Sequence, residues 1–91
     1  MSQQRNIIAD SWGRANWRPS CDRHDRCYGY NSRTNRLTCD TRFRTDLLTA
    51  CAIAYPIHSV RGTACAVAAV EAYTAVRLGG WANYKGKGKN N

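Results

Sequence analysis

Residues 21–28, which read CDRHDRCY, concentrate side chains that can do chemistry. His24 can take up or release a proton near neutral pH, while Asp25 and the cysteines can ligate metal ions. These residue types fit three kinds of site: a general base in a hydrolytic centre, a zinc site, or a disulfide-stapled helix face. The choice depends on the elements that hold the residues.

The pattern of apolar residues predicts an all-α domain of three helices joined by loops, with no strand. The expected helices span residues 21–31, 37–55 and 59–78. Ser20 is the expected cap of the first helix, Pro56 ends the second, and Gly79 and Gly80 stop the third. The third helix is rich in alanine and valine on most sides, as a buried helix would be.

All 91 residues are expected to form one domain. Residues 1–19 are a loop tied down by Trp12 and Trp17, residues 20–80 are the three-helix core, and residues 81–91 are a basic flexible tail. A chain of this size buries only about 60–65% of its unfolded surface, so its core needs staples or a metal. The five cysteines could form disulfides or bind such a metal. Because their number is odd, at least one cysteine has no disulfide partner within this sequence.

The first two helices are joined by a short turn, so they should pack antiparallel with positions equidistant from the turn facing each other. If Cys27 faces Cys39, His24 lies near Asp40, whose charge would be costly to bury alone. A carboxylate fixes the tautomer of an imidazole and raises its basicity, which prepares the other ring nitrogen to take a proton from water. A buried histidine that only satisfies Asp40 is the alternative, and the residues favour both equally.

Asp25 leaves the first helix about 100° from His24, and we expect it to face the irregular loop 10–18. Backbone carbonyls of such a loop, together with a carboxylate, bind calcium at about 2.3–2.6 Å. A base beside a cation makes a hydrolytic site, because the base activates water while the cation polarises a carbonyl. The alternative for Asp25 is a surface salt bridge with a neighbouring arginine.

The formal net charge of +8 favours anionic partners such as phospholipid headgroups, nucleic acid or an acidic protein. The arginines are scattered and form no patch interleaved with aromatic residues, so no nucleic-acid binding is expected. Residues 1–10 lack the apolar core of a signal peptide, and we expect any export signal to lie outside this sequence.

The alternative function is a zinc-stabilised basic module that binds nucleic acid or protein and has no enzymatic activity. Its ligands would be Cys21, His24, Cys27 and Cys39. Three ligands spaced three residues apart fan around the axis of one helix, which fits a tetrahedral site poorly.

The segment CDRHDRCY, followed at a short distance by CD, resembles the C-x-x-H-D motif and partner aspartate of the secreted phospholipase A2 superfamily. The segment NRLTCDTRFRTDLLTAC resembles the second catalytic helix, and GTACAVAAVEAYTAVRLGG resembles the final helix of the bacterial and fungal branch. The resemblance covers residues 10–80. It implies a small disulfide-stapled all-α fold and calcium-dependent hydrolysis of the sn-2 ester of glycerophospholipids.

By this resemblance, His24 is the general base, Asp40 orients it, and Tyr28 supports Asp40. Asp25 is similar to the aspartate that binds Ca²⁺. The family's glycine-rich calcium loop is replaced here by DSWGRANWR, in which Trp12, Gly13 and Arg14 are the candidate ligands.

The resemblance also implies two disulfides, one between Cys27 and Cys39 and one between Cys51 and Cys65. It leaves Cys21 single, because the upstream cysteine that pairs with its counterpart in the bacterial branch is missing from this sequence. A domain cut from a larger protein would explain that difference.

Charge and resemblance together predict a monomer that binds peripherally to anionic phospholipid membranes and is secreted or delivered to a target cell. It would be either the toxin domain of a larger bacterial protein, neutralised by an acidic immunity or inhibitor protein, or a free secreted enzyme. The sequence favours neither.

Overall fold

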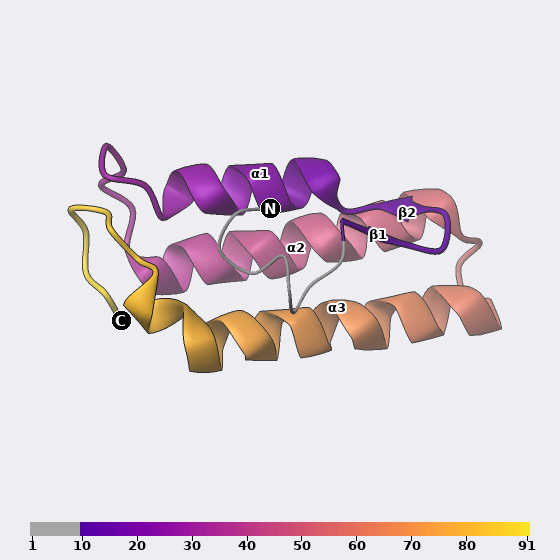
Figure 1. The fold of residues 1–91 in the computed structure, drawn as a ribbon. Helices are drawn as coiled ribbons and strands as arrows, with labels where there is room; N and C mark the ends of the chain where they lie inside the picture. The colour runs from indigo at the N-terminus through magenta and orange to yellow at the C-terminus, as the bar shows by residue number, and fades with distance from the viewer. Residues whose placement is uncertain (1–9) are drawn as a thin grey trace.

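The computed structural model describes residues 10–91, which form three helices and a small hairpin (Figure 1). The elements are β1 (Ser11–Trp12), β2 (Ala15–Asn16), α1 (Arg18–Cys27), α2 (Arg36–Ala54), α3 (Val60–Gly79) and the 3₁₀ turn η1 (Gly80–Ala82). A mostly helical domain is therefore confirmed. None of the helices in residues 10–91 has the length and hydropathy needed for a bilayer span.

The hairpin corrects the expectation that the chain has no strand. Strands β1 and β2 pair antiparallel, with Ser11 opposite Asn16 and Trp12 opposite Ala15. Gly13, at φ 55°, takes the first position of the two-residue turn between them. Glycine is favoured there because the type II′ turn that suits a hairpin needs a positive φ at that position. The strands are too short for any apolar alternation to reveal them.

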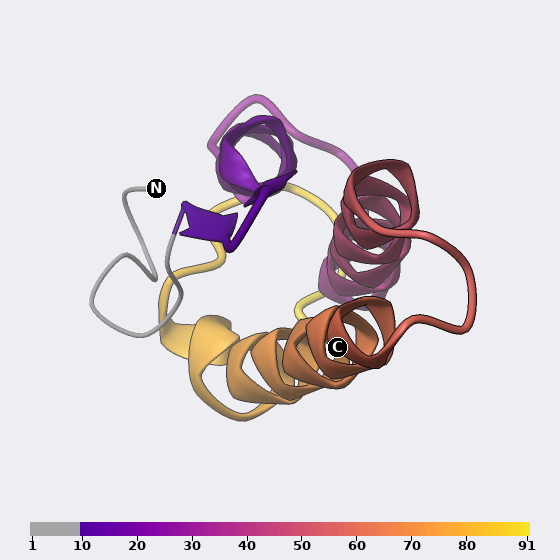
Figure 2. The ribbon, with the colours of Figure 1, turned by 90° about the vertical axis from the view of Figure 1, so that its right-hand side faces the viewer.

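The three helices lie at the corners of a triangle when viewed down their axes (Figure 2). Helix α2 packs against both α1 and α3 and runs antiparallel to each. The Cys27–Cys39 disulfide joins α1 to α2, and the Cys51–Cys65 disulfide joins α2 to α3. Both expected bridges are confirmed. In the chain-entropy model, a loop of about 15 residues closed by a disulfide stabilises the fold by about 3 kcal/mol.

Helix α1 starts and ends earlier than expected. Its first residue is Arg18, with Trp17 at the cap position and Pro19 in the first turn, where a missing N–H costs nothing. Ser20 is buried inside the helix and does not cap it. Helix α2 ends one residue before Tyr55, which is extended because Pro56 follows it.

The main core lies between the three helices and the hairpin. Its buried members are Ala15, Trp17, Cys21, Phe43, Leu47, Cys51, Tyr55, Cys65, Ala69, Ala72 and Val76. On α2 the inward face includes Arg36 and Phe43, which are buried, whereas Leu37 and Arg44 are exposed.

Helix α3 buries only one stripe, contrary to the expectation of a largely buried helix. The buried side chains on it are Cys65, Ala69, Ala72 and Val76, whereas Val60, Val67, Val70 and Leu78 are exposed. Ala and Val sit on all sides of α3, so composition alone could not tell the inner face from the outer one.

Residues 83–91, which we term the C-terminal strap, are packed along the connection between α1 and α2 (Figure 1). The strap forms backbone hydrogen bonds from Lys85 N to Tyr28 O and from Lys87 N to Ser32 O, at 2.8 and 2.7 Å. Arg36 N donates to Lys89 O at 2.8 Å. These hydrogen bonds pair backbone groups of the expected flexible tail with the body of the protein.

Candidate active site

The Cys27–Cys39 disulfide sets the register in which α1 faces α2. One turn before Cys27, His24 Nε2 lies 2.7 Å from Asp40 Oδ1. His24 is 2% exposed and Asp40 is fully buried. The expected contact between His24 and Asp40 is therefore confirmed, while the role of His24 as a base stays a prediction.

The imidazole of His24 is fixed on both faces. Its ring centroid lies 4.2 Å from that of Tyr28 and 4.5 Å from that of Phe43. Because Asp40 accepts a hydrogen bond from Nε2, the neutral ring carries its lone pair on Nδ1. Nδ1 is buried without a hydrogen-bond partner among the described residues, which is rare for a buried polar atom and marks a place for a ligand or water.

A cavity of about 140 Å³ lies between α1 and α2, and His24 is one of the residues that line it. Its walls are Arg23, His24, Cys27, Cys39, Arg42, Phe43 and Asp46. The guanidinium of Arg23 pairs with Asp46 at 3.0 Å across its mouth. The cavity can hold a few water molecules beside His24, and it is too small for a whole phospholipid.

Asp40 is the centre of a buried polar network. Tyr28 donates its hydroxyl hydrogen to Asp40 Oδ1 at 2.5 Å, so the expected support of Asp40 by Tyr28 is present. Burial, and then the hydrogen bond to Asp40, raises the pKa of Tyr28. Tyr28 is therefore a neutral donor at neutral pH.

Two arginines that sequence reasoning missed hold the other oxygen of Asp40. Arg77 Nη1 on α3 donates to Oδ2 at 2.6 Å, and Arg36 Nη1 lies 3.5 Å from the same oxygen. Arg36 precedes Asp40 by four residues on one helix, a spacing that could have revealed it. No local sequence pattern marks Arg77. The sequence indicates only that a buried Asp40 would need a positively charged partner.

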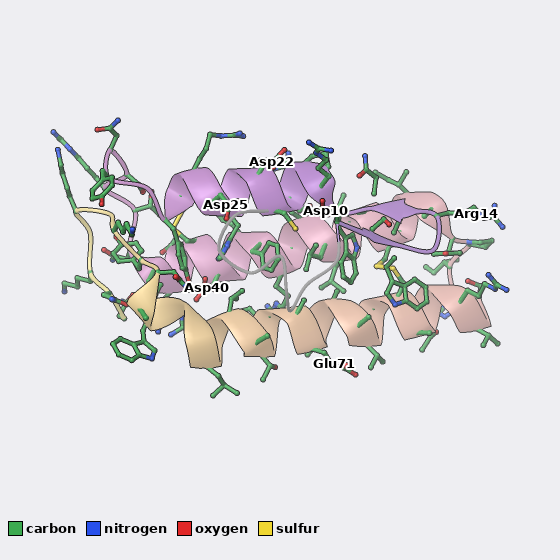
Figure 3. All side chains as sticks on the ribbon, in the orientation of Figure 1. Asp10, Arg14, Asp22, Asp25, Asp40 and Glu71 are labelled. Carbon is green, nitrogen blue, oxygen red and sulfur yellow. A yellow bond between two sulfur atoms is a disulfide. The ribbon has the colours of Figure 1, made fainter. Side chains whose placement is uncertain are left out.

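The expected calcium ligands do not come together. Trp12, Gly13 and Arg14 lie against Tyr55 at the end of α2: the Trp12 ring is 5.9 Å from the Tyr55 ring, and Arg14 N donates to the Tyr55 hydroxyl at 2.8 Å. Figure 3 shows Asp25 toward the C-terminal end of α1 and Arg14 at the tip of the hairpin, on the far side of the start of α1. Within residues 10–91, no three acidic, histidine or cysteine side chains form a metal-binding group. The set Asp25, Trp12, Gly13 and Arg14 therefore does not fit one calcium ion.

Cys21 is a free thiol that is fully buried in the main core. Burial, and then the charge of Asp10, raises its pKa to about 12. It is protonated at neutral pH and acts as a small apolar side chain. The zinc ligand set is also not available in this form, because Cys27 and Cys39 are bonded to each other and cannot be thiolates.

No protein-family model matches this chain, and neither does any curated protein or solved structure with which it was compared.

Proposed function

We propose that this protein is a phospholipase A2, which hydrolyses the sn-2 ester of glycerophospholipids with His24 as general base. The observation that carries the proposal is the buried hydrogen bond between His24 Nε2 and Asp40, combined with a partner-free Nδ1. A cavity lined by His24 and other residues of α1 and α2 offers space for water close to this histidine.

The chemistry follows from the two ring nitrogens. Nδ1 takes a proton from water as the water oxygen bonds to the ester carbonyl carbon, while Asp40 holds the proton on Nε2 and stabilises the imidazolium. The tetrahedral intermediate then breaks its bond to the glycerol oxygen, which receives the proton from Nδ1. The products are a fatty acid and a lysophospholipid. General-base assistance of this kind contributes about 10²–10⁴ in rate.

Calcium is the cofactor that the resemblance implies, and Asp25 is the residue that supports it. Trp12, Gly13 and Arg14 lie against Tyr55 and do not join Asp25 around one ion. Isothermal titration of Ca²⁺ into wild type, Asp25→Asn and Asp22→Asn tests the assignment. Loss of binding in Asp25→Asn alone supports it, whereas equal binding in all three removes Asp25 from the site.

An anionic membrane surface is the proposed partner. The net charge of +8 attracts acidic headgroups, with about 1 kcal/mol for each basic residue near the surface. Apolar side chains that could enter the interface are exposed as well, among them Ile57, Val60, Leu78 and Trp81. Trp17, by contrast, is part of the core. The same charge would suit an acidic inhibitor or immunity protein, and we expect a monomer that is secreted or delivered to its target cell.

The deciding experiment is a lipolysis assay on vesicles of phosphatidylglycerol and phosphatidylcholine, with products identified by mass spectrometry. His24→Asn should lower fatty-acid release by about 10²–10⁴. The matched control is His58→Asn, since His58 is exposed and its φ of 63° is one that asparagine tolerates. Full fatty-acid release by His24→Asn, or release from the sn-1 position only, would contradict the proposal. Omission of calcium, by EDTA, tests the cofactor in the same assay.

A further inference from the structure

The buried carboxylate of Asp40 has to be held in place if it is to orient His24. A carboxylate with no exposure to water strongly favours a cation beside it. His24 and Tyr28 both contact Oδ1 and leave Oδ2 to another partner. A cation on Oδ2 would pair the buried charge and fix the direction of the carboxylate.

Arg77 supplies that charge from the third helix. Its Nη1 donates to Asp40 Oδ2 at 2.6 Å, on the oxygen opposite the one that His24 and Tyr28 contact. Short hydrogen bonds between a guanidinium and a carboxylate are among the strongest in proteins. The side chain of Arg77 is 22% exposed, so solvent screens it only in part.

Arg36 has a different place in the network. Its Nη1 is 3.5 Å from Asp40 Oδ2 but 3.1 Å from Val76 O, so it mainly binds carbonyl groups near the end of α3. The groups that face Asp40 are thus His24 and Tyr28 from α1, Arg36 from α2 and Arg77 from α3. Of the two cations, Arg77 makes the closer contact.

The guanidinium of Arg77 is also held from the other side. Its Nη2 donates to Asn91 O, in the C-terminal strap, at 2.5 Å. The strap in turn is bonded to the first residues of α2, where Leu37 N donates to the Asn91 side chain at 2.9 Å. Arg77 therefore cannot swing into solvent without breaking a contact at each end.

We propose that Arg77 is a positioning residue of the site: its guanidinium pairs with Oδ2 of the buried Asp40 and fixes the carboxylate so that Oδ1 holds Nε2 of His24. Arg77 acts through Asp40 and touches no substrate. This inference rests on the proposed function, because it matters only if His24 must accept a proton.

Three variants test it: Arg77→Gln, which removes the charge, Arg77→Lys, which keeps it, and Arg61→Gln as a control on an exposed part of α3. Arg77→Gln should lower kcat on phospholipid by roughly 10- to 100-fold with little change in KM. This loss is smaller than the one expected for replacement of His24, because the base itself remains. Arg77→Lys should recover part of the loss, and Arg61→Gln should match wild type. Equal kcat in Arg77→Gln and Arg61→Gln overturns the proposal.

A double mutant separates positioning from a direct role or a loss of folding. In an Asp40→Asn background the carboxylate charge is gone, so Arg77→Gln should cause no further loss of kcat. Losses that multiply would show that Arg77 acts independently of Asp40 and would overturn the proposal. Circular dichroism of the double mutant, which buries no unpaired charge at either position, checks that the comparison is made between folded proteins.

A measurement without substrate keeps this inference distinct from the proposed function. The ring ¹⁵N shifts of His24 report which ring nitrogen carries the proton. The share of the tautomer protonated at Nε2 should be smaller in Arg77→Gln than in wild type or Arg77→Lys, whether or not the protein hydrolyses phospholipid. An unchanged tautomer share in folded Arg77→Gln overturns the role of Arg77, whereas absence of lipolysis in wild type overturns the proposed function alone.

Discussion

The hydroxyl of Tyr28 donates to the same oxygen of Asp40 that contacts His24, at 2.5 Å. Its ring lies 4.2 Å from the imidazole, so Tyr28 touches both members of the buried pair. Asp40 Oδ1 thereby has two donors from α1, and Oδ2 has two from α2 and α3. The carboxylate links all three helices.

Tyr28→Phe keeps the ring and removes only the donor to Asp40. Hydrogen bonds to charged groups contribute about 1.5–3 kcal/mol, and we expect the free energy of unfolding to fall by that amount. Urea denaturation measures it, with Tyr30→Phe as control because Tyr30 is 71% exposed. Lipolysis should fall less than in His24→Asn, since the imidazole remains. Equal stability of the two tyrosine variants would show that the Tyr28 hydrogen bond contributes nothing.

Removal of the two disulfides should have different effects on activity. Replacing either pair by alanines should lower the free energy of unfolding by about 2–4 kcal/mol. The Cys27–Cys39 pair also fixes the register between His24 and Asp40, whereas Cys51–Cys65 joins α2 to α3 further along. When the two variants are compared at the same fraction of folded protein, loss of Cys27–Cys39 should therefore lower kcat more than loss of Cys51–Cys65. Peptide mapping without reductant checks the pairing, and a Cys21-containing bridge would contradict the structure.

The buried thiol of Cys21 should make stability fall at high pH. Its pKa is about 12 in the folded protein against 9.0 for an ordinary thiol, so folding favours the protonated form. This contribution is complete below pH 9 and is lost as pH rises from 9 to 12, at about 1.4 kcal/mol per pH unit. The difference in unfolding free energy between wild type and Cys21→Ala, measured at pH 7.5 to 10.5, isolates it, since both contain Tyr28. A difference in unfolding free energy that does not change with pH would show that burial does not raise the pKa of Cys21.

Gly88→Ala should loosen the C-terminal strap. A Cβ at this position would lie 2.8 Å from the backbone oxygens of Arg33 and Thr34, and backbone cannot move aside easily. Hydrogen exchange at Lys87 N and Arg36 N should become faster, because these amides donate across the strap contact. Gly79→Ala is the control, since a Cβ there meets nothing within 4 Å. Equal exchange in the two variants would mean that the strap adapts without opening.

Much of the helical core and the His24–Asp40 contact could be predicted from the sequence. An antiparallel pair with a short turn leaves few registers, and a facing Cys27 and Cys39 select the one that brings His24 to Asp40. Pro56 ends α2 within one residue of the expected place, because proline restricts the residue before it. Such local rules need no knowledge of the third helix.

Features that depend on distant contacts could not be predicted. Arg77 reaches Asp40 across 37 positions of sequence, and no periodicity marks that pairing. The strap reads as a solvated basic tail, yet Gly86 and Gly88 let its backbone approach the α1–α2 connection closely. The same limit applies to the hairpin: Gly13-Arg14 carries a turn signal, but its packing against Tyr55 depends on where α2 ends.

The order of the cysteines along the chain constrains how this protein can be oxidised. The two disulfides follow one another along the sequence without overlap, because both cysteines of Cys27–Cys39 precede Cys51. Cys21, however, precedes both bridges, and a nascent chain that joins neighbouring cysteines would pair it with Cys27. In α1 those two residues are separated by about 9 Å of helical rise, beyond the Cα span of a disulfide. Formation of α1 must therefore precede oxidation, or an isomerase must release Cys27 from the wrong partner.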